Sequence, residues 1–209
     1  MKTLRLIVEG HGEVRAAPLL VRRLMQEQAG IYDVEVPEAI RRKRADFLDV
    51  SRLTLAIRLA KMEESCDGIL VLFDADDDCP AEVGPRIQEE VSKVAGETPC
   101  AVVLASREYE AWFLASIESL HGKRGILPSA KSHSAPETPR DAKGQLTKRM
   151  SKNRTYGPMV DQEALSALFD MKPSFRASRS FRKLTSAVGE LLAAMGYHLG
   201  SWPPEGWSE

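Results

Sequence analysis

The stretch Gly68 to Asp78 reads GILVLFDADDD and joins an apolar run to a cluster of acids. The run Ile69 to Phe73 is continuous rather than alternating, which predicts a strand that is covered on both faces, as in a parallel sheet flanked by helices. Four carboxylates follow it, at Asp74, Asp76, Asp77 and Asp78. Ligands of such sheets bind beyond the carboxyl ends of the strands, so these acids lie where a site is expected.

Two interpretations of the four acids stay open from this stretch alone. Like charges packed this closely repel one another unless a positive group neutralises them, and a divalent cation with oxygen ligands is the usual partner. The alternative is the solvated first turn of a helix, because aspartate is favoured there by capping and by the helix dipole.

Three further strands are expected along the chain, at Leu4 to Val8, Tyr32 to Val36 and Cys100 to Ala105. Helical spacing of apolar residues follows each strand, over about 14–28, 46–64, 80–95 and 109–120. In the second helix one face is expected to carry Leu48, Leu55, Leu59 and Met62. The order predicts an α/β fold with a Rossmann-like, mostly parallel four-stranded sheet flanked by helices.

Acids also follow two of the other strands. Glu9 ends the first strand and Glu13 begins the next helix. Glu108 and Glu110 follow the fourth strand, with Ser106 beside them as a helix cap or a hydroxyl ligand. Right-handed crossovers bring the carboxyl ends of these strands to one edge of the sheet. The convergence of three acidic strand ends favours a metal site over surface solubility.

Basic residues gather in two segments outside the strands. The run from Arg41 to Arg44 is either a solvated loop or a grip for phosphate, with Arg41 and Arg42 as candidate substrate contacts. Between His121 and Tyr156, nine Lys or Arg less two acids give a net charge of +7. A basic flap over 121–158 beside an acidic centre suits a phosphodiester substrate, whereas a polar linker is the alternative.

The three parts expected are therefore a metal-binding α/β core over 1–120, a mobile basic flap over 121–158 with one short helix near 141–151, and a helical return over 159–209. Phe175 and Phe181 are expected to anchor that return on the core. The 209 residues suit one such domain with an appendage.

Composition excludes some classes of protein. The net charge of −1 makes no global case for nucleic-acid binding. The chain has no apolar run near the ~20 residues that span a bilayer, and its amino terminus is too quickly acidic for a signal peptide, so a cytoplasmic protein is expected. Three scattered cysteines, Cys66, Cys79 and Cys100, argue against a disulfide framework and a zinc site.

Three other acidic motifs fit less well. A calcium loop starting at Asp74 puts Cys79 where the turn glycine belongs. A haloacid dehalogenase phosphatase also places D-x-D after an apolar strand, but it wants Thr or Val at Asp78 and normally uses the first strand. A phosphoreceiver requires an acidic pair after the first strand and a lysine after the fifth, and neither is visible here.

The arrangement resembles the Toprim fold, the metal-binding catalytic domain of topoisomerases, bacterial primases and the overcoming-lysogenization-defect (OLD) nucleases. The resemblance rests on Glu9 after the first strand and on Asp74-x-Asp76 after the third. The OLD-type pattern is matched further by Glu13, four residues after Glu9, and by Ser106-x-Glu108. One position departs, because the lysine that such nucleases carry two residues after that glutamate is Glu110 here.

Longer segments resemble a small bacterial family of Toprim-like proteins of unknown function akin to RloB. These segments are SREYEAWFLAS from Ser106, RTYGPMVDQ from Arg154 and SFRKL from Ser180. Members of such families are often encoded beside an ABC- or AAA-type ATPase. The resemblance therefore implies an ATPase partner and a role in phage defence.

The resemblance also implies two-metal hydrolysis of a nucleic-acid phosphodiester. One Mg²⁺ or Mn²⁺ is expected on Glu9, Asp74 and Asp76. A second is expected near Glu13, Ser106 and Glu108, with Asp78 close by. Positional candidates for the cationic stabiliser are Lys131, Lys143 and Lys148. Two other functions stay open, a non-catalytic metal-binding partner or sensor of an ATPase and a small-molecule phosphatase.

Overall fold

Five parallel strands form one sheet in the computed structural model, which describes residues 1–63 and 65–207. Three strands are long: β1 (Lys2–Val8), β4 (Gly68–Asp74) and β5 (Cys100–Ala105). The other two, β2 (Val34–Glu35) and β3 (Ile40–Arg41), are short and both pair with β1. The strand order is β2-β1-β4-β5, and the Rossmann-like α/β fold that the sequence predicted is confirmed.

The second strand differs from the prediction. It was expected over 32–36, where only Val34–Glu35 forms a strand, and an additional short strand, β3, follows at Ile40–Arg41, so the sheet has five strands instead of four. Pro37 lies between the two pieces and has no N–H to donate to a ladder, which accounts for the interruption. As a result β3 uses part of the basic run Arg41 to Arg44 that was expected to be a loop.

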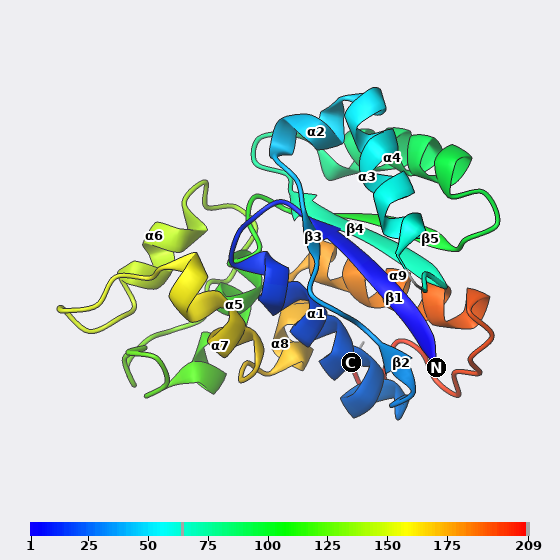
Figure 1. Ribbon diagram of the computed structural model, residues 1–209. Helices are drawn as coiled ribbons and strands as arrows, with labels where there is room; N and C mark the ends of the chain where they lie inside the picture. The colour runs from blue at the N-terminus through cyan, green and yellow to red at the C-terminus, as the bar shows by residue number, and fades with distance from the viewer. Residues whose placement is uncertain (64, 208–209) are drawn as a thin grey trace.

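Helices cover both faces of the sheet, as the continuous apolar run in β4 predicted (Figure 1). Leu70 and Leu72 join a core on one face, and Ile69, Val71 and Phe73 join a core on the other. The first core is closed by α1 (Glu13–Arg23), α5 (Ala111–Ala115), α8 (Met171–Ala177) and α9 (Arg179–Ala194). The second is closed by α2 (Arg44–Leu48), α3 (Val50–Met62) and α4 (Pro80–Ala95).

The helix expected over 46–64 is two helices, and its buried face was wrongly predicted. Asp49 separates α2 from α3, and its carboxylate caps α3 by accepting a hydrogen bond from the Arg52 N–H. The residues that face the sheet are Leu53, Ala56, Ile57 and Ala60, whereas Leu48, Leu55, Leu59 and Met62 are exposed. The two alanines let α3 approach the sheet closely, and no local pattern distinguishes that face from the leucine face.

Residues 121–158 pack on the core instead of standing away from it as a mobile loop. The segment follows a short 3₁₀ helix η2 (Ile117–Leu120) and contains one helix, α6 (Ala142–Thr147), near the expected position. An isolated antiparallel bridge joins Ile126 to Met150. Six of its apolar side chains are buried in the first core, which is the reason the segment is held: Ile126, Ala130, Ala142, Leu146, Met150 and Tyr156.

The helical return after residue 158 is confirmed. Residues 1–63 and 65–207 contain two π-helical turns, η1 (Leu24–Gln28) after α1 and η3 (Pro158–Gln162) at the start of the return. The return continues through α7 (Glu163–Ser166), α8 and α9. Phe175 and Phe181 are buried as expected. In Figure 1 the long strands run away from the N-terminus, and their carboxyl ends lie at the end of the sheet that is nearer to α6, so this side of the molecule holds the acidic strand ends.

Across the two described ranges, the structure contains no helix whose length and apolar character would suffice to cross a membrane.

Candidate acidic centre

A cavity of about 330 Å³ opens where β1 and β4 end. Its charged lining comes from three strand ends and from α6, namely Glu9, Glu13, Asp74, Glu110 and Lys143. Glu108 adjoins this set, because its Oε1 lies 2.6 Å from the Lys143 ammonium. The acidic centre is defined here as Glu9, Glu13, Asp74, Glu108 and Glu110. The structure thus brings together acids that are about a hundred residues apart in sequence.

Glu13 is held in place by the turn that precedes it. Its Oε2 accepts hydrogen bonds from the N–H groups of Glu9 and Gly10, each at 3.2 Å. Gly10 permits this contact, because a Cβ there would lie 2.8 Å from Glu13 Oε1, and Gly12 lets the η3 segment approach, because a Cβ there would lie 2.6 Å from the Pro158 carbonyl oxygen. Burial is the main cause that raises the pKa of Glu13 to about 7, and the charges of Glu110 and Glu9 add to it.

Asp74 and Glu110 are the other buried acids. Asp74 Oδ1 accepts a hydrogen bond of 2.8 Å from the Tyr109 N–H, and Glu110 Oε1 accepts one of 2.7 Å from the Tyr156 hydroxyl. Burial raises the pKa of both carboxyls, and the pKa of Asp74 rises further because Glu13 and Glu110 are close. The centre therefore carries more negative charge than its protein surroundings compensate.

Lys143 supplies the positive charge inside the centre. Its ammonium lies 2.6 Å from Glu108, 3.2 Å from Glu110 and 3.7 Å from Asp74. Burial alone would lower the pKa of Lys143, but the nearby Glu110 and Asp74 outweigh it and raise the pKa above its ordinary value. Glu108 also fixes α6, because its Oε2 accepts from the N–H groups of Ala142 and Lys143 at 2.6 and 3.2 Å.

Asp76 and Asp78 turn toward Arg44 instead of into the cavity. The Arg44 guanidinium lies 3.3 Å from Asp76, 2.5 Å from Asp78 and 3.8 Å from Glu9. It also donates hydrogen bonds to the backbone carbonyls of Asp74 and Ala75, so it pins the loop that carries the acids. Asp76 was expected to share one ion with Glu9 and Asp74. In this structure its carboxylate pairs with Arg44 instead.

Ser106 lies apart from the acidic centre. It lines a separate groove beside β5, together with residues of α4 and α9. The S-x-E spacing does not predict toward which side of the β5 end the Ser106 side chain points. The expectation of Ser106 as a metal ligand therefore has no support in this geometry.

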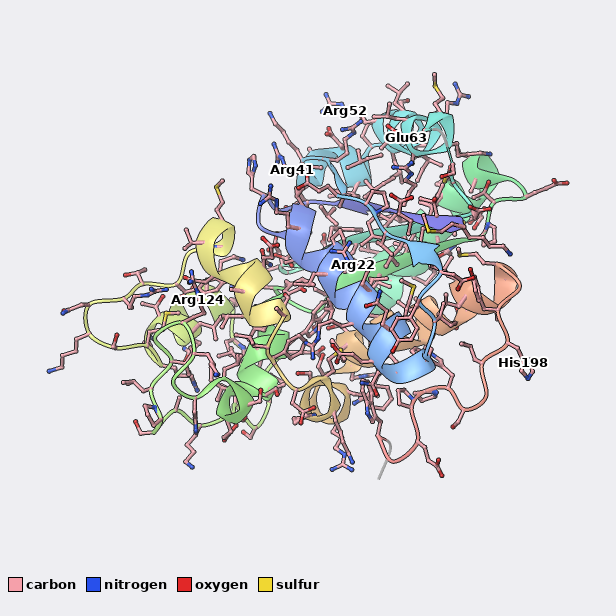
Figure 2. The ribbon with its side chains drawn as sticks, turned by 60° about the horizontal axis from the view of Figure 1, so that its bottom comes forward. Arg22, Arg41, Arg52, Glu63, Arg124 and His198 are labelled. Atoms are coloured by element: carbon pink, nitrogen blue, oxygen red, sulfur yellow. The ribbon has the colours of Figure 1, made fainter. Side chains whose placement is uncertain are left out.

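Only one of the five candidate substrate-binding residues reaches the cavity. Lys143 lines it, whereas Lys131 and Lys148 are exposed and do not. Arg41 lies at its edge, with a guanidinium nitrogen 3.5 Å from the Glu9 carbonyl oxygen. Arg42 donates to the Arg41 carbonyl instead. Figure 2 shows Arg41 beside the first turn of α1, far from Arg124 on the lobe around α6.

The donor set suits a hard divalent cation, although the oxygens are not gathered around one point. Within residues 1–63 and 65–207, no three His, Cys, Asp or Glu side chains are placed to hold a metal ion together. Over the same residues, however, Glu9 Oε2 and Glu110 Oε2 are buried without a hydrogen-bond partner, and each faces one cation, Arg44 at 3.8 Å and Lys143 at 3.2 Å. Buried oxygens of this kind are rare and call for an explanation such as an ion. Carboxylate oxygens are the ligands that Mg²⁺ and Mn²⁺ prefer.

Glu13→Gln tests whether the centre is destabilised by its own charge. Glu13 titrates near 7 in the folded protein instead of at its usual 4.5, so the folded state holds a proton that the unfolded chain has lost between these values. Stability of the metal-free protein should therefore fall as pH rises through this window, by up to about 3 kcal/mol.

The Glu13→Gln variant has no carboxyl to titrate at this position, so its stability lacks this dependence on pH. Urea unfolding in EDTA should show Glu13→Gln gaining stability relative to the wild type at pH 8 and little at pH 4.5. An equal difference at both pH values would contradict a raised pKa at Glu13.

The sequence did not predict the roles of two residues of this site, the buried acid Glu110 and the cation Lys143. Glu110 was noticed only as an acid near the fourth strand, yet it is fully buried in the cavity. Its position four residues after Ser106, at the start of a helix full of buried aromatics, was the signal available. Lys143 was one of three positional candidates, and no local pattern distinguished it from Lys131 or Lys148.

Comparison with protein families gives one match, to a model described as a domain of unknown function (DUF4276), over residues 8–189. Comparison with curated proteins and with solved structures gives no match.

Proposed function

The chain belongs to the DUF4276 family, a domain of unknown function, and from its acidic centre we propose that it is a Mg²⁺- or Mn²⁺-dependent phosphodiester hydrolase. One observation carries the proposal. Four carboxylates from three strand ends line a single cavity, and Glu108 adjoins them through Lys143, the cation among them. Such a concentration of acid at the carboxyl edge of a parallel sheet is costly to stability, and a function that requires it accounts for its presence.

Glu9, Asp74 and Glu110 are the residues proposed to hold the ion. Each has a carboxylate on the cavity, and the Glu9 and Glu110 oxygens that lack hydrogen bonds already face the cationic side chains of Arg44 and Lys143, so a metal cation would take over or share these contacts. Glu13 is held by two backbone N–H groups and would complete the ligand set from a fixed position. When bound, the ion would supply a hydroxide nucleophile and stabilise charge on the phosphoryl oxygens.

Lys143 and Arg41 are proposed to receive the phosphate. The side chain of Lys143 is 36% exposed, so its ammonium faces both the acids and the opening of the cavity. A phosphate that enters this opening would meet it as a charged hydrogen-bond donor. Arg41 stands at the rim beside Glu9 and adds a second cation on the approach. The combination of acids inside and cations at the opening favours a phosphodiester over a neutral substrate.

The finer likeness to Toprim and OLD nucleases belongs to this proposal. It is supported by Glu9, Glu13, Asp74 and Glu108, which lie at or shortly after the ends of β1, β4 and β5, whereas Asp76 and Ser106 face elsewhere. OLD-type nucleases carry a lysine at the position of Glu110. Lys143 is proposed as its spatial counterpart, because it reaches Glu108 from α6. A nucleic acid as substrate, an ATPase as partner and a role in phage defence are proposed on the same likeness.

The test is a hydrolysis assay with purified protein and either Mg²⁺, Mn²⁺ or EDTA. Supercoiled plasmid, single-stranded DNA, RNA and p-nitrophenyl phosphate serve as substrates. Cleavage of a polynucleotide that requires metal and stops in EDTA supports the proposal. Turnover of p-nitrophenyl phosphate alone would indicate a phosphatase.

Titration with Mn²⁺ provides a second measurement that does not depend on finding the substrate. Binding of one or two ions that is lost in a Glu9→Gln/Asp74→Asn variant places the metal in the acidic centre. Metal binding without hydrolysis of any substrate would favour a metal-binding partner or sensor. If no Mn²⁺ binds, the metal-dependent mechanism is wrong.

A further inference from the structure

A second and larger cavity, of about 780 Å³, lies along the outer edge of β5. We call it the edge groove and define it by Cys79, Pro85, Gln88, Leu104, Arg179 and Lys183 among its lining residues. Its walls are the first turns of α4 and of α9, and its floor is the edge of the strand. Its volume lies in the range of sites that bind ligands, and it is separate from the cavity of the acidic centre.

One edge of β5 has no neighbouring strand among the described residues, because β5 is the last strand in the order β2-β1-β4-β5. The β4 ladder uses alternate residues of β5, as the bonds from Ile69 N–H to Pro99 and from Ala75 N–H to Ala105 show. The backbone groups of the residues in between, Cys100, Val102 and Leu104, therefore point toward the edge groove.

The first half of this edge is already satisfied by a side chain. The Gln88 amide donates a hydrogen bond of 3.1 Å to the Cys100 carbonyl and accepts one of 2.7 Å from the Val102 N–H. A single amide that donates and accepts at alternate residues does what one peptide unit of an added strand would do. Gln88 thus shows that the geometry of this edge suits pairing with a peptide group.

The second half of the edge is open. In the part of the chain that the structure describes, the Val102 carbonyl, the Leu104 N–H and the Leu104 carbonyl have no hydrogen-bond partner. Exposed strand edges of this kind are templates for pairing, and natural proteins usually cover or charge them. Here no strand of the described residues pairs with this half, and Val102 and Leu104 are apolar, so no charge of its own interrupts it; both residues lie at the floor of the groove with only 4% of their surface exposed.

Two cations stand over this open half. Arg179 and Lys183 lie one turn apart on α9, are exposed, and form no ion pair with any residue in the described ranges. The acid nearest to them in the groove, Glu137, is occupied, because its Oε1 accepts from the Ser180 N–H at 2.8 Å and from the hydroxyls of Ser178 and Ser180. The groove therefore holds two cations against one hydrogen-bonded acid, which leaves it with a net positive charge beside an apolar floor.

The shape of the groove decides between a single strand and a second copy of this chain. α4 and α9 pack on opposite faces of β5 and rise on both sides of its edge. A second copy would bring the same two helices against these before its own β5 could reach the edge. A lone extended segment, with no helices of its own, fits between them.

We propose that the edge groove binds an extended, acidic peptide segment of a partner protein, which pairs with β5 as an added strand. Backbone hydrogen bonds to Val102 and Leu104 would supply affinity, as in other cases of strand addition. Alternate side chains of the peptide would pack on the apolar floor, and acidic ones would meet Arg179 and Lys183. The inference stands independently of the hydrolase, because none of these residues belongs to the acidic centre.

The experiment uses the full chain and a library of fluorescent heptapeptides with Val, Ile or Thr at alternate positions and Asp or Glu between them. Binding is measured by fluorescence anisotropy. The best peptide is then tested with Lys in place of its acids, and with N-methyl groups on the backbone nitrogens that face the strand. Both changes should abolish binding, because the first reverses the charge and the second removes the donors for the ladder.

The binding position is measured by amide hydrogen exchange and by two matched variants. Exchange of the Leu104 N–H should slow when the best peptide is bound. Lys183→Glu should weaken binding by about tenfold or more, since it sets a like charge against the peptide. Lys93→Glu is the control, because Lys93 is an exposed residue of α4 that is paired with Glu89 and Glu90 and does not line the groove.

Three results would overturn the proposal. The first is the absence of binding by every acidic peptide of the library at millimolar concentration. The second is binding that survives backbone methylation. The third is equal loss in Lys183→Glu and Lys93→Glu.

Discussion

Asp74→Asn should abolish metal-dependent hydrolysis while leaving the protein folded. Asparagine keeps the shape of the side chain and can still accept the hydrogen bond from the Tyr109 N–H through its amide oxygen. It removes the charge at the end of β4 that the ion requires. Loss of outer-shell partners of metal sites costs about 10- to 100-fold in activity or affinity, so loss of a direct ligand should exceed about 100-fold. The measurement is the initial rate of cleavage with saturating Mn²⁺.

Asp77→Asn is the matched control for this variant. Asp77 lies in the same acidic run, but its side chain is 67% exposed and pairs with Arg107 and Arg140 outside the central cavity. The control should retain activity within a few-fold of the wild type. Mn²⁺ binding measured on the same two proteins shows whether Asp74 acts through the ion. Undiminished cleavage by Asp74→Asn would remove Asp74 from the proposed mechanism.

Lys143→Met should destabilise the metal-free protein at pH 8. The ammonium of Lys143 is the positive charge closest to Asp74, Glu108 and Glu110, and a thioether in its place leaves these carboxylates without compensation. Breaking a fully buried ion pair costs about 3–5 kcal/mol, and the 36% exposure of this side chain reduces the expected loss to about 2–3 kcal/mol. Urea unfolding in EDTA measures it.

The pH and metal dependence of this loss identify its cause. At pH 5 the loss should be smaller, because the raised pKa values of Asp74 and Glu110 keep more of the acid protonated and less charge needs a partner. Mn²⁺ at saturation should restore stability to Lys143→Met more than to the wild type, since a bound ion replaces the missing charge.

Lys148→Met provides the control, because Lys148 directly follows the same helix and is exposed. Equal stability of Lys143→Met and the wild type at pH 8 would show that the lysine does not hold the centre together.

Much of the fold was readable from the chain because it rests on local patterns. The continuous apolar run before Asp74 predicted a strand buried on both faces, and β4 is that strand. Gly30 and Gly96, which directly follow helical segments, have the positive φ angles that helix ends use. Phe175 and Phe181 were expected to be buried, and they are.

The errors occurred where two local patterns competed. In α3 the leucine face and the alanine face have the same helical period, and only the fit to the sheet decides which is buried. The second strand was expected over 32–36 because these residues favour a strand. Only Val34–Glu35 forms one, and the proline that follows Val36 separates it from β3. The basic segment over 121–158 has the composition of a loop, and the few apolar residues that hold it are too scattered to form a pattern.

The sequence by itself determined which strand ends carry acid, because Glu9, Asp74 and Glu108 each follow a run whose period can be read over a few residues. Only the tertiary structure decided that Glu110 turns inward, that Lys143 is its counter-ion, and that Asp76 and Ser106 face elsewhere. These outcomes depend on contacts between segments far apart in the chain. The energy of such contacts is set by burial and charge at the meeting point, which no local spacing encodes.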